Sequence, residues 1–172
     1  RGPTESTEFS MTRFLVPALS GYRGWSLYMD CDMLCRADIA ELAEKISLEE
    51  GKALVVCKHD YVPRTERKLL DQVQTRYERK NWSSLMLFNN ARCRALTPEY
   101  VNSASGLDLH RFAWTDERLI GALPLEWNWL VGEYERNAAA KIVHFTLGGP
   151  YFEEYRRCDY AEEWFAERRQ MK

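Results

Sequence analysis

The stretch that decides the fold is Trp25-Ser-Leu-Tyr-Met-Asp-Cys-Asp32. Its first five residues form a short, mainly apolar run, which predicts a buried strand that closes on acidic residues. In an extended chain the side chains of Asp30 and Asp32 project to one side, because residues two apart share a face. Two carboxylates at that spacing can share one hard divalent cation. Asp-x-Asp is also a frequent triplet, so a solvated strand end in which Asp32 caps the following segment is the alternative interpretation.

The periodicity of the chain changes repeatedly on both sides of this stretch, as it does in folds that alternate strands and helices. Strands are predicted at 25–30, 53–57, 84–89, 126–131 and 141–146. Helices are predicted at 9–19, 38–45, from 97 onward, 116–123 and 151–171, with a charged loop containing some helix at 60–81. We therefore predict an α/β fold whose central sheet is mainly parallel, contains strands 25–30, 53–57 and 141–146, and is flanked by helices. Ligands of such sheets gather beyond the carboxyl ends of the strands.

The composition is that of a globular protein with a real core. The chain has 172 residues, which suggests a single domain over residues 1–172. Apolar residues make up 45%, and the net charge of −2 gives no electrostatic reason to expect nucleic acid as a partner. No apolar run approaches the roughly 20 residues of a transmembrane span. The cysteines include no Cys-x-x-Cys pair, so we expect reduced thiols in a cytoplasmic protein, not a zinc ribbon or a disulfide framework.

Four motifs in one order carry a resemblance to a known family. The segment 7–42 places a helix containing Arg13 before the Asp-x-Asp strand and another helix after it. The later motifs are Lys80-Asn-Trp-Ser-Ser-Leu-Met-Leu-Phe-Asn89, Trp114-Thr-Asp-Glu-Arg-Leu-Ile120 with Leu123-Pro-Leu-Glu-Trp-Asn128, and Ile142-Val-His-Phe-Thr-Leu-Gly148. Over most of residues 7–152 the chain resembles the retaining glycosyltransferases of family 8. This resemblance implies a GT-A fold and a hexosyltransferase that uses a nucleotide sugar.

The resemblance implies a metal centre formed by Asp30, Asp32 and His144. One imidazole and two carboxylates suit a divalent cation, and Mn²⁺ more than Mg²⁺. The metal would hold the diphosphate of the donor and neutralise the charge that develops on the leaving group. The alternative interpretation of His144, taken alone, is a core histidine at the end of a strand.

The resemblance also implies groups that bind the diphosphate. Gly148 and Gly149 would let backbone amides approach it closely. The family's usual Lys-Pro-Trp after the glycine is replaced here by Gly149-Pro150-Tyr151, so the cation expected at that place is missing. Arg13, which matches an arginine of the family's helix, would supply positive charge instead. A surface salt bridge is the alternative interpretation of Arg13.

Asp116 and Glu117 match the place of the family's catalytic and sugar-binding residues. The Asp116 carboxylate would accept hydrogen bonds from sugar hydroxyls, or, alternatively, only cap a helix over 116–123. Glu117 stands where the family commonly has glutamine, and a carboxylate there would stabilise positive charge at the anomeric carbon or trap it covalently. An exposed residue in a first helical turn is the alternative. Ser83 and Ser84 fall where an acceptor-binding Asn or Asp is common, which predicts an unusual acceptor.

The sequence leaves three functions open. The first is a metal-dependent retaining glycosyltransferase with a UDP-sugar donor and a saccharide or other hydroxyl acceptor. Because the family's opening nucleotide-binding strand has no counterpart before residue 7, the chain is expected to be the later part of a GT-A fold. The second is a catalytically degenerate transferase-like module for binding or assembly. The third is an Asp-x-Asp phosphohydrolase, against which Leu34 and the order of the motifs argue.

Overall fold

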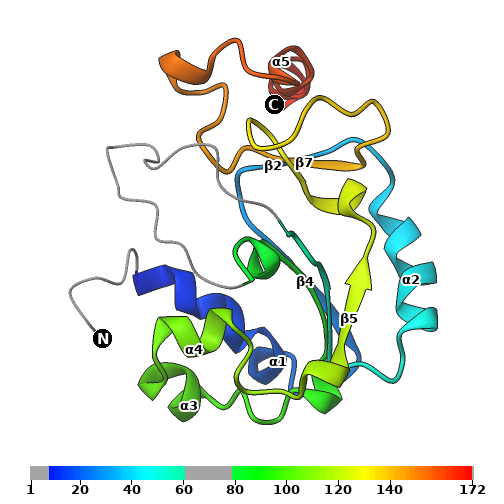
Figure 1. Ribbon diagram of the computed structural model, residues 1–172, viewed down its shortest axis with the longest axis vertical. Coiled ribbons are helices and arrows are strands. Elements are labelled where there is room, and N and C mark those ends of the chain that lie inside the picture. The colour runs from blue at the N-terminus through cyan, green and yellow to red at the C-terminus, as the bar shows by residue number, and fades with distance from the viewer. Residues whose placement is uncertain (1–7, 61–78, 172) are drawn as a thin grey trace. The chain divides into compact units, whose positions relative to one another are not determined.

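The computed structural model describes residues 8–60 and 79–171, which fall into two compact units (Figure 1). The first unit contains residues 8–29, 40–59 and 79–123, and the second contains 30–39, 60 and 124–171. Most of the charged loop predicted at 60–81 lies outside the described residues. The expectation of one domain over 1–172 stays a prediction.

The first unit is built on a four-stranded sheet of apolar segments. Its strands are β1 (Trp25–Met29), β3 (Leu54–Cys57), β4 (Leu85–Asn89) and β5 (Ile120–Leu123), in the order β1-β4-β3-β5. β4 runs antiparallel to both of its neighbours, whereas β3 and β5 are parallel. Every residue of β3 is buried, as expected for a central strand that is covered on both faces.

Short helices with clear local start signals cover this sheet. The helical segments of the first unit are η1 (Glu8–Leu15), α1 (Val16–Leu19), α2 (Leu42–Leu48), η4 (Trp82–Ser84), η5 (Asn90–Arg92), α3 (Pro98–Ser103), α4 (Gly106–His110) and η6 (Glu117–Leu119). The Thr97 hydroxyl caps α3 by accepting from the Tyr100 amide, and Pro98 opens that helix. α1, α3 and α4 lie on one side of the sheet, and α2 lies on the other (Figure 1).

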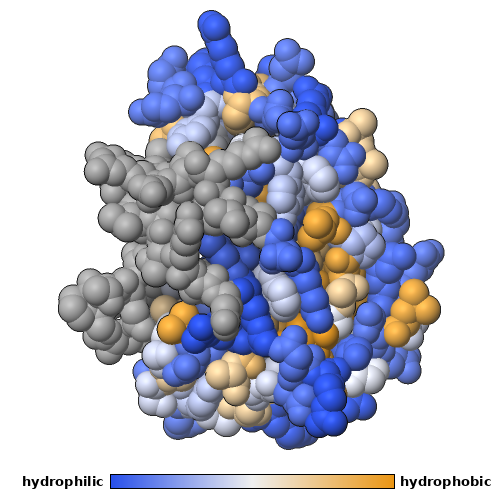
Figure 2. Space-filling model, in the orientation of Figure 1, coloured by the Kyte–Doolittle hydropathy of each residue, from blue (hydrophilic) through white to orange (hydrophobic). Residues whose placement is uncertain are grey.

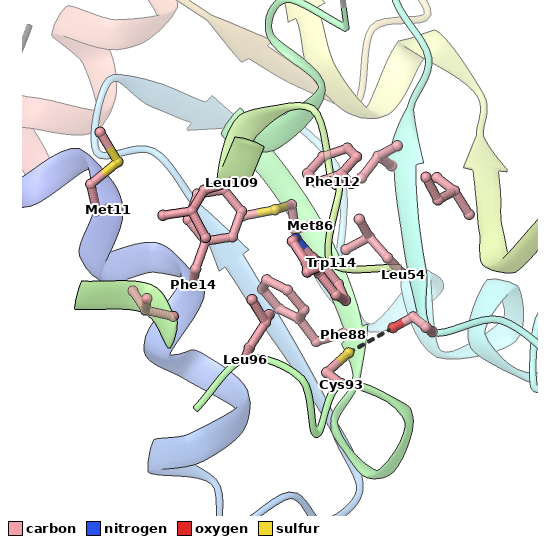
Figure 3. Packing of buried hydrophobic residues seen from close by; sticks show 14 residues of the cluster. Met11, Phe14, Leu54, Met86, Phe88, Cys93, Leu96, Leu109, Phe112 and Trp114 are labelled. Carbon is pink, nitrogen blue, oxygen red and sulfur yellow. Dashed lines mark hydrogen bonds between the residues drawn. The ribbon is translucent and has the colours of Figure 1, made fainter. Parts of the chain in front are cut away.

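The core of the first unit lies between the sheet and the helices η1, α3 and α4. Phe14 of η1, Leu109 of α4 and Phe88 of β4 are fully buried and belong to one cluster (Figure 3). The Cys93 thiol donates a hydrogen bond to the Ala53 carbonyl oxygen at 3.2 Å. Burial raises the pKa of this thiol to about 12, so Cys93 behaves as a small apolar residue of the core.

The second unit contains a smaller sheet and the C-terminal helix. Its strands β2 (Met33–Cys35), β7 (Ile142–His144) and β6 (Trp129–Leu130) lie in the order β2-β7-β6, antiparallel for the first pair and parallel for the second. The other segments are η7 (Leu125–Asn128), η8 (Glu153–Tyr155) and α5 (Ala161–Gln170), while η2 (Ile39–Glu41) spans the boundary between the units. The surface over α5 is mostly hydrophilic in Figure 2, in keeping with its many charged residues.

The predicted α/β class is confirmed, but the mainly parallel central sheet is wrong. Only β3 and β5 are parallel in the first sheet, and the strand predicted within 141–146 belongs to the other sheet. A buried apolar run has the same pattern in either direction, so the sequence period does not fix strand orientation. The direction depends on where the connecting segments bring the chain back to the sheet.

Three predicted elements are corrected by tertiary contacts. The helix at 116–123 is a single turn, η6, followed by β5, because Ile120–Leu123 pairs with β3 in place of continuing a helix. The strand at 126–131 is reduced to β6, because a turn in which the Trp127 amide donates to the Pro124 carbonyl comes first. The helix at 151–171 begins only at Ala161, after Tyr160 adopts a left-handed φ of 62°.

The core of the first unit gives a stability prediction. Phe88→Ala should lower the free energy of unfolding by about 3–5 kcal/mol, because it leaves a cavity among residues that cannot fully collapse. Leu48→Ala is the control, since Leu48 is 78% exposed and its truncation should change stability little. Urea unfolding followed by circular dichroism measures both, and a Phe88→Ala loss no larger than that of the control would contradict the packing described.

Candidate functional site

The pairing of β2 with β7 builds the predicted metal centre. Met33 is paired with His144 across this antiparallel ladder. The Phe145 amide donates to the Asp32 carbonyl oxygen at 3.0 Å, which continues the pairing one residue beyond the ladder. The register therefore places the acidic segment that precedes β2 beside the histidine that ends β7.

Asp30, Asp32 and His144 converge as expected. Their potential ligand atoms all lie within 4.8 Å of one another, and among residues 8–60 and 79–171 they form the one such group of three. His144 is buried, whereas both aspartates are half-buried and the Asp32 side chain keeps 29% of its exposure. The Nε2 atom of His144 lies 3.3 Å from Oδ1 of Asp32. This donor set, two carboxylate groups and one imidazole, fits a divalent transition-metal cation. Metal binding itself stays a prediction.

Asn128 completes this cluster, although the sequence pattern gave it no role. It ends η7 and is fully buried. Its Oδ1 lies 3.1 Å from Nδ1 of His144, on the side of the ring away from the Asp32 contact. Asn128 ends the motif Leu123-Pro-Leu-Glu-Trp-Asn128, but neither that motif nor the predicted strand at 126–131 indicated a contact with His144, which arises only when η7 packs on β7.

Gly148 and Gly149 lie four and five residues beyond His144 and are packed against tyrosine rings. A Cβ on Gly148 would come within 2.4 Å of the Tyr155 ring, and one on Gly149 within 2.2 Å of the Tyr151 ring. Gly148 also has a φ of 147°, which disfavours other residues. Its amide donates to the Phe145 carbonyl oxygen at 2.9 Å. Close packing is therefore sufficient to explain both glycines, and their contact with a diphosphate stays a prediction.

Tyr151 stands where the family has the tryptophan of its Lys-Pro-Trp segment. The charges of the acidic segment act on its hydroxyl. Burial, followed by the negative charges of Asp32 and Cys31, raises the pKa of its hydroxyl. Its ring is tilted against those of Phe152 and Trp164, with centres 4.7 and 5.7 Å away, and remains 50% exposed. A half-exposed aromatic face therefore lies near the predicted metal centre, within the same unit.

Arg13 belongs to the first unit and binds carbonyl groups there. Its Nε donates to the Ser10 carbonyl and its Nη1 to the Ser83 carbonyl, both at 2.8 Å. The guanidinium also lies over the Tyr28 ring, 5.0 Å from its centre. These contacts tie η1 to the segment before β4. The alternative of a surface salt bridge and the binding of a phosphate by Arg13 both stay predictions.

Asp116 caps η6, as its alternative interpretation expected. Its Oδ1 accepts from the Arg118 amide at 2.9 Å, and its Oδ2 accepts from the Arg118 guanidinium at 2.8 Å. These hydrogen bonds lower the pKa of the Asp116 carboxyl to about 2. The carboxylate is thus ionised and held in one orientation. Both of its oxygens already accept hydrogen bonds from Arg118.

Glu117 forms an ion pair with Arg79 and retains 61% of its side-chain exposure. It stands in the first turn of η6, where a carboxylate also interacts favourably with the amide dipoles. Asp116 and Glu117 belong to the first unit, whereas the cluster of Asp30, Asp32 and His144 belongs to the second. Their catalytic roles stay predictions.

Ser83 forms a partly buried pair with His110 that sequence reasoning missed. The Ser83 Oγ and the His110 Nδ1 are 2.6 Å apart, and the His110 ring meets that of Phe14 edge to face. Burial, with a smaller effect of the Arg13 charge, lowers the pKa of His110 from 6.5 to about 4. The pair joins two segments 27 positions apart, a separation that no local motif reveals.

Comparison with known proteins identifies the fold. No family model matches the chain. The curated protein named Protein CDI, from Arabidopsis thaliana, is 44% identical over 174 residues, and the match covers 97% of this chain and 66% of that protein. The chain thus spans slightly less than two thirds of its curated relative.

Three solved structures share the architecture at 15% sequence identity each. The bifunctional glycosyltransferase WbbM matches 94% of this chain and 35% of its own, with a TM-score of 0.62. An active-site mutant of LgtC matches 92% and 65%, with a TM-score of 0.58. The glycosyltransferase GlyE of Streptococcus pneumoniae TIGR4 matches 96% and 44%, with a TM-score of 0.55. The fold is of the GT-A glycosyltransferase type.

Within residues 8–60 and 79–171, no helix combines the length and apolar character that crossing a membrane requires.

The half-buried His110 gives a prediction about pH. Between about pH 6.5 and pH 4 the unfolded chain binds a proton at this ring and the folded chain does not. Stability should therefore be fully present above pH 6.5 and fall as the pH decreases toward 4, by about 3 kcal/mol from this group. His110→Asn should flatten that part of the stability curve, whereas Ser83→Ala, which keeps the ring, should not. The free energy of unfolding is measured by urea unfolding at each pH. An equal decrease in wild type and His110→Asn between pH 6.5 and pH 4 would contradict the assignment.

Proposed function

We propose that the chain is part of a metal-dependent, retaining glycosyltransferase that transfers a sugar from a nucleoside diphosphate to a hydroxyl acceptor. The observation that carries the proposal is the convergence of Asp30, Asp32 and His144 within 4.8 Å on a GT-A fold. The proposal accounts for three features together: the acidic strand end, the buried histidine and the register that joins them.

Asp30, Asp32 and His144 would hold the divalent metal, Mn²⁺ in preference to Mg²⁺, because an imidazole ligand favours the softer ion. When bound, the metal supplies positive charge for the diphosphate leaving group. The half-exposed aspartates leave that side of the cluster open to phosphate oxygens, while the buried His144 anchors the opposite side. Tyr151 offers a half-exposed phenol beside Asp32 where the family has a cationic segment, so a hydrogen-bond donor would stand in for a charge.

The donor proposed is a nucleoside-diphosphate sugar, with UDP favoured by the family resemblance. Another solved structure is the galactosyltransferase LgtC in complex with donor and acceptor sugar analogues, which matches 91% of this chain at 16% identity and a TM-score of 0.50. That protein binds both kinds of ligand on the fold this chain shares. For the present chain, a saccharide or other hydroxyl compound is the acceptor proposed.

Asp116 and Glu117 are proposed to act on the sugar. The Asp116 carboxylate is ionised throughout the neutral range and has lone pairs beyond those that Arg118 uses, so it can accept from sugar hydroxyls. Glu117 is exposed and would stabilise positive charge at the anomeric carbon once a donor is bound. Its ion pair with Arg79 must then open or be shared with the substrate.

A second candidate function is a transferase-like module that binds without catalysis. It is favoured because the proposed functional groups already have partners within the chain. Arg118 pairs with Asp116, and Arg79 pairs with Glu117. The Gly148 amide donates to a carbonyl of its own turn. Nucleotide binding at the metal centre is common to both candidates, and turnover separates them. A phosphohydrolase is not favoured, because the fold is that of glycosyltransferases.

Metal-dependent nucleotide binding tests the centre. Binding of UDP, followed by titration calorimetry, should require Mn²⁺, because two carboxylates otherwise repel the phosphates. Asp32→Asn should weaken it severely. Asp38→Asn is the matched control, since Asp38 is exposed, lies on the same segment and is outside the cluster, so its change should have little effect. Equal binding with and without a chelator would refute the metal-centre proposal.

The charge of Glu117 gives a test of mechanism. Glu117→Gln keeps the shape of the side chain and removes its charge, so turnover of the nucleotide sugar should fall on the order of 100-fold if that charge stabilises the transition state. Glu44→Gln, an exposed change on α2, should leave turnover unchanged. Unchanged turnover in Glu117→Gln together with an inactive Asp116→Asn would assign catalysis to Asp116 and leave Glu117 as a helix-start residue.

A further inference from the structure

Asn128 is held rigidly beside the metal-binding histidine. Its side chain is fully buried, and the preceding Trp127 is only 1% exposed. Two backbone hydrogen bonds hold η7 in place: the Trp127 amide donates to the Pro124 carbonyl at 3.1 Å, and the Lys141 amide donates to the Glu126 carbonyl at 2.7 Å. The last bond connects η7 directly to the start of β7. Asn128 is therefore positioned by the backbone, not by a flexible side chain.

The contact between Asn128 and His144 determines where the imidazole carries its proton. The amide oxygen Oδ1 only accepts hydrogen bonds, and it lies 3.1 Å from Nδ1 of His144. An oxygen acceptor beside Nδ1 favours the tautomer that carries its proton on Nδ1, in which Nε2 keeps its lone pair. Metal-binding histidines commonly donate their other ring N–H to an oxygen atom, which fixes both the tautomer and the orientation of the ring.

In this tautomer two electron-rich atoms face each other. With the proton on Nδ1, the Nε2 lone pair of His144 turns toward Oδ1 of Asp32, 3.3 Å away. Two lone pairs at that distance in a half-buried setting repel each other, and a cation that both atoms bind relieves the repulsion. The opposite tautomer, with the Asn128 amide group donating to Nδ1, would instead form a direct Nε2–H bond to Asp32 and weaken the site for metal.

We propose that Asn128 is a positioning residue that holds His144 in the Nδ1-protonated tautomer and so presents Nε2 as a metal ligand. This inference rests on the proposed metal centre and deepens it. Asn128 is outside the proposed donor set and would act on it through His144. Its effect should therefore appear first in the protonation pattern of one ring and in the affinity for the metal ion.

Nitrogen-15 NMR of the metal-free full chain in alkaline buffer reads the tautomer directly. The His144 signals are assigned by their loss in His144→Gln, which separates them from those of the other two histidines. Wild type should show the proton on Nδ1, and Asn128→Asp, which keeps an oxygen acceptor, should show the same. Asn128→Leu, which removes the acceptor, should lose this preference. A wild-type spectrum with the proton on Nε2 would overturn the proposal.

Mn²⁺ affinity, measured by titration with the metal alone, gives the second readout. Asn128→Leu should weaken binding about 10- to 100-fold, and Asn128→Asp should restore it. Asn90→Leu is the matched control: Asn90 is an equally buried asparagine of the first unit, hydrogen-bonded to Arg23 and Ser26, so it should lower stability without changing Mn²⁺ affinity. Wild type that binds no Mn²⁺ refutes the proposed function, whereas tight binding by wild type and by a folded Asn128→Leu alike refutes only the role of Asn128.

Discussion

The antiparallel register of β2 on β7 is the constraint on which the candidate site depends. The pairing of Met33 with His144 sets the Asp-x-Asp segment and the histidine side by side, although they are more than 100 positions apart in the sequence. A slip of one residue would turn His144 to the other face of the sheet, because side chains alternate along a strand. The short ladder is reinforced on both sides of the pair, by the Phe145–Asp32 and Arg36–Lys141 backbone bonds.

The neighbours of the buried His144 ring define its proposed role. The buried imidazole has the Asn128 oxygen as the partner of its Nδ1, and its Nε2 faces the Asp32 carboxylate, with which it would share the proposed cation. The backbone of the same residue is also used, since its carbonyl accepts from the Val131 amide at 2.9 Å. The packing of His144 therefore also determines the direction in which its ring nitrogens point. The same contacts that stabilise the small sheet also orient the proposed ligands.

In the first unit, arginine side chains organise the polar groups that the family resemblance singles out. Arg13 binds the carbonyl of Ser83, Arg118 binds Asp116 and Arg79 pairs with Glu117. Arg118 and Asp116 are exposed, so their pair contributes little to stability and is easily rearranged. Arg13 is partly buried and bridges η1 to the start of η4, which makes it part of the framework. This contrast separates groups that are free to meet a substrate from groups that hold the unit together.

The sequence by itself determined the α/β class, the strands at Trp25–Met29, Leu54–Cys57 and Leu85–Asn89, and the candidate cluster of Asp30, Asp32 and His144. These features were predictable because apolar runs of strand length and an i, i+2 carboxylate pair are local patterns, and because a family resemblance linked them to a distant histidine. Only the tertiary structure decided that β4 runs antiparallel between β1 and β3, that Ile120–Leu123 is a strand, and that Asn128 reaches His144. The reason is physical: strand direction, pairing and side-chain partners depend on how the connections return the chain, and local periodicity carries no information about that return.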